Sequence, residues 1–398
     1  MHATGARNAG PASMTALLPI MATIFVAFLV TGIAMPVLPL HVHEGLGLSA
    51  VAVGLVAGSQ FAAALISRPL AGRHADTRGA KHAVIIGLVL ASSAGVLYFA
   101  SLQFLSLPAT SVAILLLGRA LLGVGESFVI TGAQTWGLLL GGPRHTGKVL
   151  AWAGSAMWGA FAVGAPLGMM LYADLGFPAI AATTTLVPLA ALLVVARLRQ
   201  IAPTVRTRSG LSKVVAAIWL PGLGLALSSA GFGAMTAFVA LLFAARGWTV
   251  WPAFTVFASV FILARVFFGH AADTIGGARI ALICVLVEAA GQAMLWIAPW
   301  TGLALVGAAL TGFGWSLVYP GFGIEAVRRA PAGHQGMAMG AYTAFLDLAL
   351  GIASPLLGLI ASRAGIGAVF LASAILVLSA STIAASLLRM PAHKLQTA

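Results

Sequence analysis

Residues 14–36 read MTALLPIMATIFVAFLVTGIAMP, a stretch without a charged side chain that is long enough to cross a membrane as one helix. Residues 84–105 are apolar in the same continuous way. Neither stretch alternates between apolar and polar residues, as a strand of a membrane barrel would. Because lipid offers the backbone no hydrogen-bond partners, only helices or closed barrels can span it. These stretches therefore predict membrane-spanning helices.

The composition of the whole chain agrees with this prediction. Of 398 residues, 61% are hydrophobic, and 21 Lys and Arg with 8 Asp and Glu make up the 7% that are charged. Soluble domains carry about a quarter of charged residues, so a soluble globular fold is excluded. The predicted fold class is an all-α membrane protein. Cys284 is the one cysteine, which leaves no disulfide and no thiolate metal cluster, and we expect neither a cofactor nor a metal.

Segments of about 20 apolar residues, the length of a spanning helix, occur twelve times. The most basic connection between them, residues 197–213, follows the sixth segment. We therefore expect a six-helix bundle in 14–196, a cytoplasmic linker in 197–213, a second six-helix bundle in 214–388, and cytoplasmic tails in 1–13 and 389–398. The expected spans are 14–36, 49–67, 82–104, 111–140, 149–173, 177–196, 214–244, 252–268, 280–298, 302–325, 337–361 and 366–388.

The basic residues predict how the chain is oriented. With a cytoplasmic amino terminus, nearly all Lys and Arg side chains fall in cytoplasmic loops and tails, Arg246 and Arg363 fall outside, and Arg119 falls inside the membrane. Positive charge is concentrated on the cytoplasmic side of membrane proteins. Both termini are thus expected in the cytoplasm. The net charge of +13 then reflects orientation, and we expect no nucleic-acid partner.

Parts of the sequence are repeated. Residues 67–79 (SRPLAGRHADTRG) agree with residues 264–276 (ARVFFGHAADTIG) at six of thirteen positions, at an offset of 197 residues. Residues 118–125 (GRALLGVG) agree with residues 307–314 (GAALTGFG) at five of eight positions, at an offset of 189. Duplicated halves are frequent in secondary transporters, whose sites lie between the halves near the membrane midplane.

These motifs resemble those of a known family. Residues 72–81, GRHADTRGAK, resemble the signature loop of the major facilitator superfamily, and residues 269–279 resemble its weaker second copy. Residues 115–125 are similar to the arginine motif of proton-coupled members, and residues 159–168 to the glycine-proline motif of drug antiporters. The chain also resembles bacterial arabinose-efflux-permease-like members. The resemblance implies the major facilitator fold, in a multi-pass protein of the bacterial inner membrane.

The resemblance also implies a cytoplasmic latch between the halves. Asp76 is expected to neutralise the positive end of the eleventh span, and Glu325 is a candidate partner of Arg265 in a mirrored contact. The alternative is that these are solvated charges that fix the topology, since exposed ion pairs contribute only about 0–1 kcal/mol. The residues expected in the latch are Arg68, Gly72, Asp76, Gly79, Arg265, Asp273 and Glu325.

Three acidic residues, Glu126, Glu288 and Asp347, fall inside predicted spans. Ionisable groups inside a membrane cost about 2.5–3.5 kcal/mol on insertion scales and are candidates for a functional role. The resemblance places Glu126 and Asp347 toward the central cavity and Glu288 in an outer helix. We expect Glu126, Asp347 and Arg119 to couple transport to protons. The alternative for each is a hydrogen bond between helices.

Arg119 and Glu126 are two helical turns apart, about 10.5 Å along one face of a helix. Both side chains lean toward the amino terminus of that helix, so a direct salt bridge is not expected, and water, substrate or another helix would bridge them. At the repeat offset of 189, Glu126 corresponds to Trp315 and Asp347 to Trp158. The halves therefore differ in charge at the membrane centre.

Aromatic and amide side chains supply the other candidates for a substrate cavity, since rings can contact an amphiphilic or cationic ligand. The alternative for each ring is packing. His41, His43 and Glu44 form a weak metal-like group, for which an external gate or a solvated turn is preferred. The expected cavity residues are Arg119, Glu126, Gln134, Trp136, Trp152, Trp158, Phe232, Phe238, Trp315, Tyr319, Tyr342 and Phe345.

The sequence favours a proton-coupled secondary transporter that works by alternating access and exports small amphiphilic or polar compounds. A symporter that imports a sugar, an amino-acid derivative or an organic acid is the alternative. A membrane enzyme is disfavoured because no cluster of nucleophile and base is found, and an ATP-driven pump because no phosphate-binding loop is found. The expected partners are a small-molecule substrate, protons and the lipid bilayer, and the expected state is a monomer.

Overall fold

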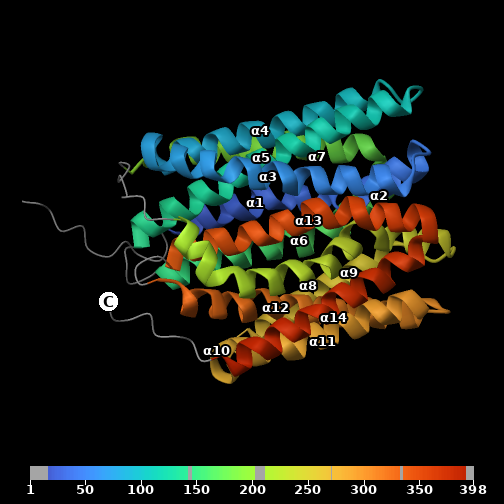
Figure 1. Cartoon of the computed structure of the whole chain (residues 1–398). Helices are drawn as coiled ribbons and strands as arrows, with labels where there is room; N and C mark the ends of the chain where they lie inside the picture. Colours follow the sequence, from blue (N-terminus) through green and yellow to red (C-terminus); the bar gives the residue numbers. More distant parts are fainter. Residues whose placement is uncertain (1–16, 142–145, 202–210, 270, 332–334, 391–398) are drawn as a thin grey trace, which may run out of the picture.

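The structure is a computed structural model, and it describes residues 17–141, 146–201, 211–269, 271–331 and 335–390. Within these residues, twelve helices are long and apolar enough to cross a membrane, which confirms the predicted count. Their axes are broadly aligned, so that they form one bundle, and consecutive spans run in opposite directions (Figure 1). We call helices α1–α7 the first half and helices α8–α14 the second half.

The helices of the first half are α1 (Leu18–Ala34), α2 (Val37–Leu40), the π-helical turn η2 (His41–Gly45), α3 (Ala50–Arg78), α4 (Ala80–Leu102), α5 (Pro108–Gly141), α6 (Thr146–Leu175) and α7 (Phe177–Arg197). Those of the second half are α8 (Leu211–Ala245), α9 (Trp251–Phe268), α10 (Ala271–Ile275), α11 (Gly277–Ile297), α12 (Thr301–Arg329), α13 (Gln335–Ala364) and α14 (Ile366–Arg389).

The signature motif at residues 72–81 was expected as a loop, but most of it forms the last turns of α3, which continues to Arg78. A helix forms its backbone hydrogen bonds within itself, whatever its side chains are. It can therefore continue beyond the apolar segment through charged residues. The turn itself is made by Gly79, whose φ of 103° favours glycine, and Gly276 makes the equivalent turn before α11 with a φ of 100°. The repeated motif thus encodes the same turn twice.

Both halves use the same set of helix contacts. In the first half α4 packs on α5 and α7, α3 on α5, and α1 on α6, and in the second half α11 packs on α12 and α14, α9 on α12, and α8 on α13. The close approaches repeat as well. A side chain at Gly123 would collide with the carbonyl of Gln60, and one at Gly312 with the carbonyl of Phe257.

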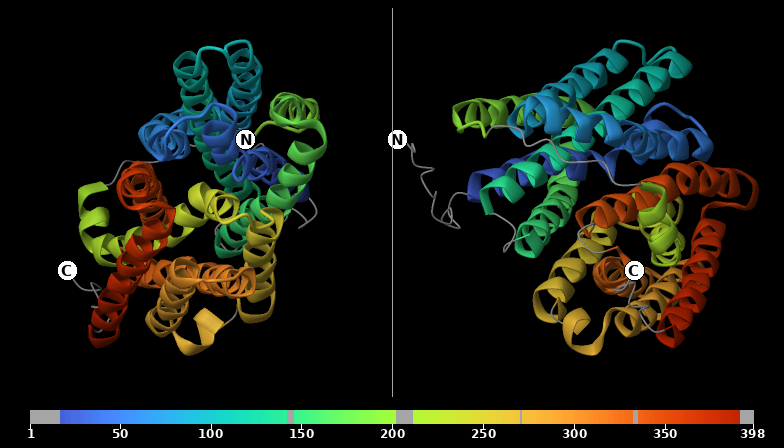
Figure 2. Two further views of the ribbon diagram at one scale, coloured as in Figure 1. Left: turned by 90° about the vertical axis from the view of Figure 1, so that its right-hand side faces the viewer. Right: turned by 60° about the vertical axis from the view of Figure 1, so that its left-hand side comes forward.

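The two halves meet mainly along two interfaces, α3 with α13 and α6 with α9. Seen along the bundle, the first half and the second half form two groups of helices that face each other (Figure 2). Because α3 and α9 are repeat equivalents, and α6 and α13 likewise, the two interfaces are equivalent positions of the repeat. They surround the space in which a site between the halves would lie.

The two ends of the bundle differ in charge. We call the end where Arg78, Arg197 and Arg329 lie the basic end, and the end with Arg246 and Arg363 the opposite end. At the basic end, Lys81 donates hydrogen bonds to the carbonyls of Ala196 and Leu198, at 2.8 and 2.6 Å. The basic end is on the left in Figure 1 and the opposite end on the right.

Helices α3 and α13 approach each other closely toward the opposite end. On α3, a Cβ at Gly58 would lie 2.9 Å from the carbonyl oxygen of Gly351 on α13. On the same helix, a Cβ at Gly54 would collide with the carbonyl of Ser354 of α13. The α3–α13 interface is therefore closed by backbone contact in the part that faces the opposite end.

Candidate functional site

Glu126 lies in α5 and is held by two other helices. Its carboxylate accepts a hydrogen bond from the Thr31 hydroxyl of α1 and another from the Gln60 amide of α3, the latter at 2.5 Å. The residue is 7% exposed. Burial costs a charged group its water, and these donors replace part of it. Thr31 and Gln60 were not among the residues predicted for the site, although each is a polar side chain within an apolar span.

Arg119 lies on the same helix and is 2% exposed. Among the described residues no ion pair joins it to Glu126, as the helical spacing predicted. Its Nε and Nη1 atoms have no hydrogen-bond partner within the described residues. The phenol of Tyr98, on α4, lies beside the guanidinium. Arg119 is therefore a buried cation with no carboxylate partner among the described residues.

Arg119 lines a small cavity between the halves. Apart from the guanidinium and the Thr236 hydroxyl of α8, the walls are apolar. The other residues that line the cavity are Met35, Leu38, Pro39, Val53, Val56, Ala57 and Phe61. The cavity thus presents one positive charge against an apolar surface contributed mostly by the first half.

Asp347 forms an ion pair with Arg68 across the α3–α13 interface. Both Nε and Nη2 of Arg68 contact the carboxylate, and the two side chains are 21% and 7% exposed. The hydroxyl of Tyr319 lies 3.1 Å from that of Thr343 nearby, in α12 and α13. Arg68 was expected in a cytoplasmic loop, but this is wrong, because α3 continues through it and carries it to Asp347.

The equivalent positions of the α6–α9 interface carry different chemistry. There Arg265 corresponds to Arg68, and Trp158 to Asp347. The guanidinium carbon of Arg265 lies 5.6 Å from the ring centroid of Phe261, and the Phe261 ring lies 5.3 Å from that of Trp158. One interface thus joins an arginine to a carboxylate, and the other joins an arginine to aromatic rings.

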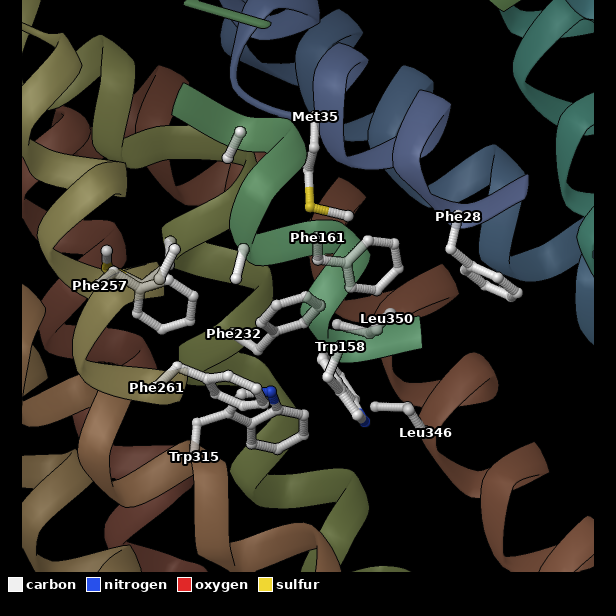
Figure 3. Packing of buried hydrophobic residues seen from close by; sticks show 14 of the residues in the cluster. Phe28, Met35, Trp158, Phe161, Phe232, Phe257, Phe261, Trp315, Leu346 and Leu350 are labelled. Carbon is white, nitrogen blue, oxygen red and sulfur yellow. The ribbon is translucent and has the colours of Figure 1, made fainter. Parts of the chain in front are cut away.

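Trp158 is the centre of an aromatic cluster that joins the halves (Figure 3). Its ring centroid lies 5.5 Å from Phe232, 6.0 Å from Trp315 and 6.2 Å from Tyr319, which belong to α8 and α12. Phe232 and Trp315 stack on each other at 5.3 Å. The structure brings these four predicted cavity residues together, with their rings packed against one another.

The remaining predicted cavity residues are packed fully or partly inside the bundle, and none of them lines the cavity beside Arg119. Their contact with a substrate stays a prediction. These residues are Gln134, Trp136, Trp152, Phe238, Tyr342 and Phe345.

Glu325, expected opposite Arg265, is only 3% exposed and binds elsewhere. Its carboxylate pairs with Arg328 and Arg329 of the same helix and accepts a hydrogen bond from the Ala278 amide of α11 at 3.3 Å. The predicted Glu325–Arg265 pair is therefore wrong. Spacings of three and four residues bring the neighbouring guanidiniums to Glu325 along its own helix, whereas Arg265 turns toward Phe261.

The other residues expected in the latch lie at the basic end. Asp76 is exposed near the end of α3 and makes no ion pair within the described part of the chain. Gly72 precedes it on α3, and Gly79 makes the turn into α4. The side chain of Asp273 lies outside the described residues. A latch at Asp76 stays a prediction.

Glu288 is sealed inside the second half. It is fully buried on α11, and its carboxylate accepts a hydrogen bond from the Ser228 hydroxyl of α8 at 2.6 Å. A side chain at Gly231 would collide with this carboxylate. Glu288 therefore contributes to the packing of α8 against α11, away from the contact between the halves.

The ring of His41 stacks on Phe177 at a centroid distance of 3.8 Å, whereas His43 and Glu44 are exposed. The described residues contain no group of three or more side chains that could hold a metal ion. The arrangement at η2 is that of a turn fixed by ring stacking.

Twelve spans in two similar halves, with buried charges where the halves meet, define a membrane transporter of the duplicated type. The chain belongs to the Major Facilitator Superfamily, whose sequence profile matches residues 20–252 and 246–398. This confirms the resemblance given by the signature motif.

Relatives and solved structures agree with this family. The chain is 42% identical to an uncharacterized MFS-type transporter of Salmonella typhimurium (STM4428) over 374 residues, 94% of this chain and 96% of that protein. It is 42% identical to an uncharacterized MFS-type transporter of Burkholderia mallei (BMASAVP1_A0869) over 88% of this chain and 86% of that one. The crystal structure of a D-xylose-proton symporter covers 97% of this chain and 100% of its own, with a TM-score of 0.79 at 14% identity, which shows the shared fold.

Proposed function

We propose that this chain is a proton-coupled secondary transporter that works by alternating access, and that Glu126 carries the proton. The observation that carries the proposal is the setting of Glu126, a buried carboxyl at the junction of α1, α3 and α5. A carboxyl is the one common side chain that can be negative or neutral in such a place while keeping hydrogen bonds in both forms.

The partners of Glu126 suit both forms. In the ionised form it accepts from Thr31 and Gln60. In the neutral form its hydroxyl can donate, and the Thr31 hydroxyl can rotate to accept. Helix α3 contacts α13 of the second half, and α2, which follows α1, contacts α8. A change in the hydrogen bonds of Glu126 therefore acts on helices that lie next to the second half.

The Arg68–Asp347 pair supports alternating access. It joins α3 to α13 beyond the tightly packed part of their interface, so separation of the halves at this point has to break it. Protonation of Asp347 would remove its charge and weaken the pair. We therefore assign Asp347 a second role in coupling, with Arg68 as its partner.

Two directions of coupling follow from different observations. The resemblance to the glycine-proline motif favours export in exchange for protons. The guanidinium of Arg119, which forms no ion pair within the described residues, favours a negatively charged substrate. Symport with a proton would compensate the charge of such a substrate. Proton flux measured in both directions separates the two.

The test uses the full chain in proteoliposomes that enclose a pH-sensitive dye. A panel of organic acids, sugars, amino-acid derivatives and cationic drugs is added outside, and the pH change inside is followed. We expect one class of compound to drive proton movement in the wild type and Glu126→Gln to reduce it by about tenfold or more, the size of effect that loss of a proton-transfer group produces.

Glu288→Gln is the matched control, because it neutralises another fully buried acid that lies inside the second half. It should retain coupled proton movement. Full coupling in a folded Glu126→Gln protein, with the same substrate flux and pH response as the wild type, would refute the assignment of Glu126.

A further inference from the structure

We propose that the cavity beside Arg119 binds the negative group of the substrate, which is an organic anion with an apolar body. This inference rests on the proposed function and adds the class of substrate to it.

Arg119 is a buried cation near the contact between the halves, and it forms no ion pair within the described residues. The two buried carboxylates nearby have other partners. Asp347 forms an ion pair with Arg68, and Glu126 accepts hydrogen bonds from Thr31 and Gln60. Arginine keeps its proton in proteins, so Arg119 cannot become neutral to relieve its burial. A buried charge is retained where something of opposite charge meets it. A bound anion would supply that charge.

The guanidinium is suited to this task by its geometry. Its planar fork of N–H groups matches a carboxylate or a phosphate, which it can bind through two parallel hydrogen bonds. Nε and Nη1, the donors that lack partners here, lie on different edges of the fork, and each shares its edge with Nη2. A carboxylate that bridges Nη2 and either of these donors would therefore form two parallel hydrogen bonds with Arg119.

The other residues that line the cavity indicate the chemistry of the uncharged part of the ligand. Phe61, Met35 and Val56 are among the apolar side chains that form its walls, and Thr236 is the contribution of the second half. The cavity is small in this conformation, about 10 Å³, so a carboxylate or phosphate on a hydrocarbon or aromatic body would reach Arg119 and these walls when the halves separate here. Because α3, α5 and α8 all contribute, such a ligand would touch both halves.

The anion and the proton of Glu126 should favour each other. The titratable and charged groups around these two residues are Tyr98 on α4, Arg68 on α3 and Asp347 on α13, besides Arg119 and Glu126 themselves. An ionised Glu126 repels an anion at Arg119, and a neutral Glu126 does not. By linkage, a bound anion equally favours protonation of Glu126, so the two would be carried in the same direction.

The experiment measures binding with no membrane and no pH gradient. Purified full-length protein in detergent is titrated by calorimetry with benzoate and with hexanoate, and separately with benzamide and hexanamide, which have the same bodies without the charge. We expect at least one acid to bind the wild type about tenfold or more tightly than its amide, as one charge-assisted hydrogen-bonded contact provides.

Three variants identify the residue. Arg119→Gln should abolish the preference for the acid over the amide, and Arg119→Lys should keep part of it. Arg363→Gln, which removes an exposed arginine at the opposite end, should leave it unchanged. Each variant is first checked for a single symmetric peak on size exclusion.

A wild type that binds no acid more tightly than its amide overturns the proposal. So does a folded Arg119→Gln protein that keeps the preference, because Arg119 would then serve only Glu126 or the packing. Glu126→Gln, which resembles the protonated form, should bind the acid at least as tightly as the wild type. If the acid binds through Arg119 but proteoliposomes show no proton movement with it, the anion site stands and the proposed coupling fails.

Discussion

Replacing Asp347 with Asn should destabilise the protein measurably, because it leaves Arg68 charged and unpaired between α3 and α13. Loss of one partner of a buried ion pair costs about 3–5 kcal/mol in unfolding free energy. The Arg68 side chain retains 21% exposure, so water can replace part of the lost interaction. We therefore expect a loss of roughly 2–3 kcal/mol, below the range for fully buried pairs.

A double-mutant cycle separates the ion pair from its surroundings. The proteins are wild type, Asp347→Asn, Arg68→Gln and the double variant, each purified in detergent and unfolded by heat. The double variant should be more stable than Asp347→Asn, since neither charge is left alone. Arg363→Gln serves as a control for loss of an exposed arginine and should leave the melting temperature unchanged. A coupling energy below about 0.5 kcal/mol, the level at which distant residues appear additive, would refute the pair.

Three further predictions concern packing. Gly123→Ala should lower stability by about 1–3 kcal/mol, the usual cost of overpacking, whereas Gly154→Ala, which meets no described atom within 4 Å, should leave the melting temperature unchanged. Trp158→Ala should cost about 3–5 kcal/mol through the lost ring contacts, and a melting temperature equal to that of the wild type would contradict the central cluster. Glu288→Gln should keep the Ser228 hydrogen bond and change the unfolding free energy by less than about 1 kcal/mol, while Glu288→Lys should give no monodisperse protein.

The number of spans and the repeat were predictable because both depend on local sequence. A run of apolar residues is itself the signal for a spanning helix. The helix ends were less predictable. The apolar window in the second span stops near Arg68, but α3 continues to Arg78, since a helix does not need apolar side chains to close its own hydrogen bonds.

The ion pair between Arg68 and Asp347 could not be predicted from the sequence. Arg68 and Asp347 are 279 residues apart, and nothing local to either residue indicates the other. The separation of Arg119 from Glu126, in contrast, was predictable, because both lie on one helix with fixed geometry.

The cavity walls were missed for a different reason. Most of the residues predicted for the cavity were aromatic, but the cavity beside Arg119 is lined mostly by aliphatic residues such as Met35 and Val53. In a membrane protein an aliphatic side chain can face lipid, a neighbouring helix or a cavity, and its chemistry is the same in all three places. Only the arrangement in space distinguishes them.

The two interfaces between the halves differ in their chemistry, so a change in pH affects them unequally. Asp347 in the α3–α13 interface can gain or lose a charge, whereas the rings of Phe261 and Trp158 in the α6–α9 interface have no titratable group. A change in acidity can therefore loosen only one of two positions that the duplication made equivalent. The duplication therefore left a backbone frame that is symmetric and a distribution of ionisable carboxyl groups that is not.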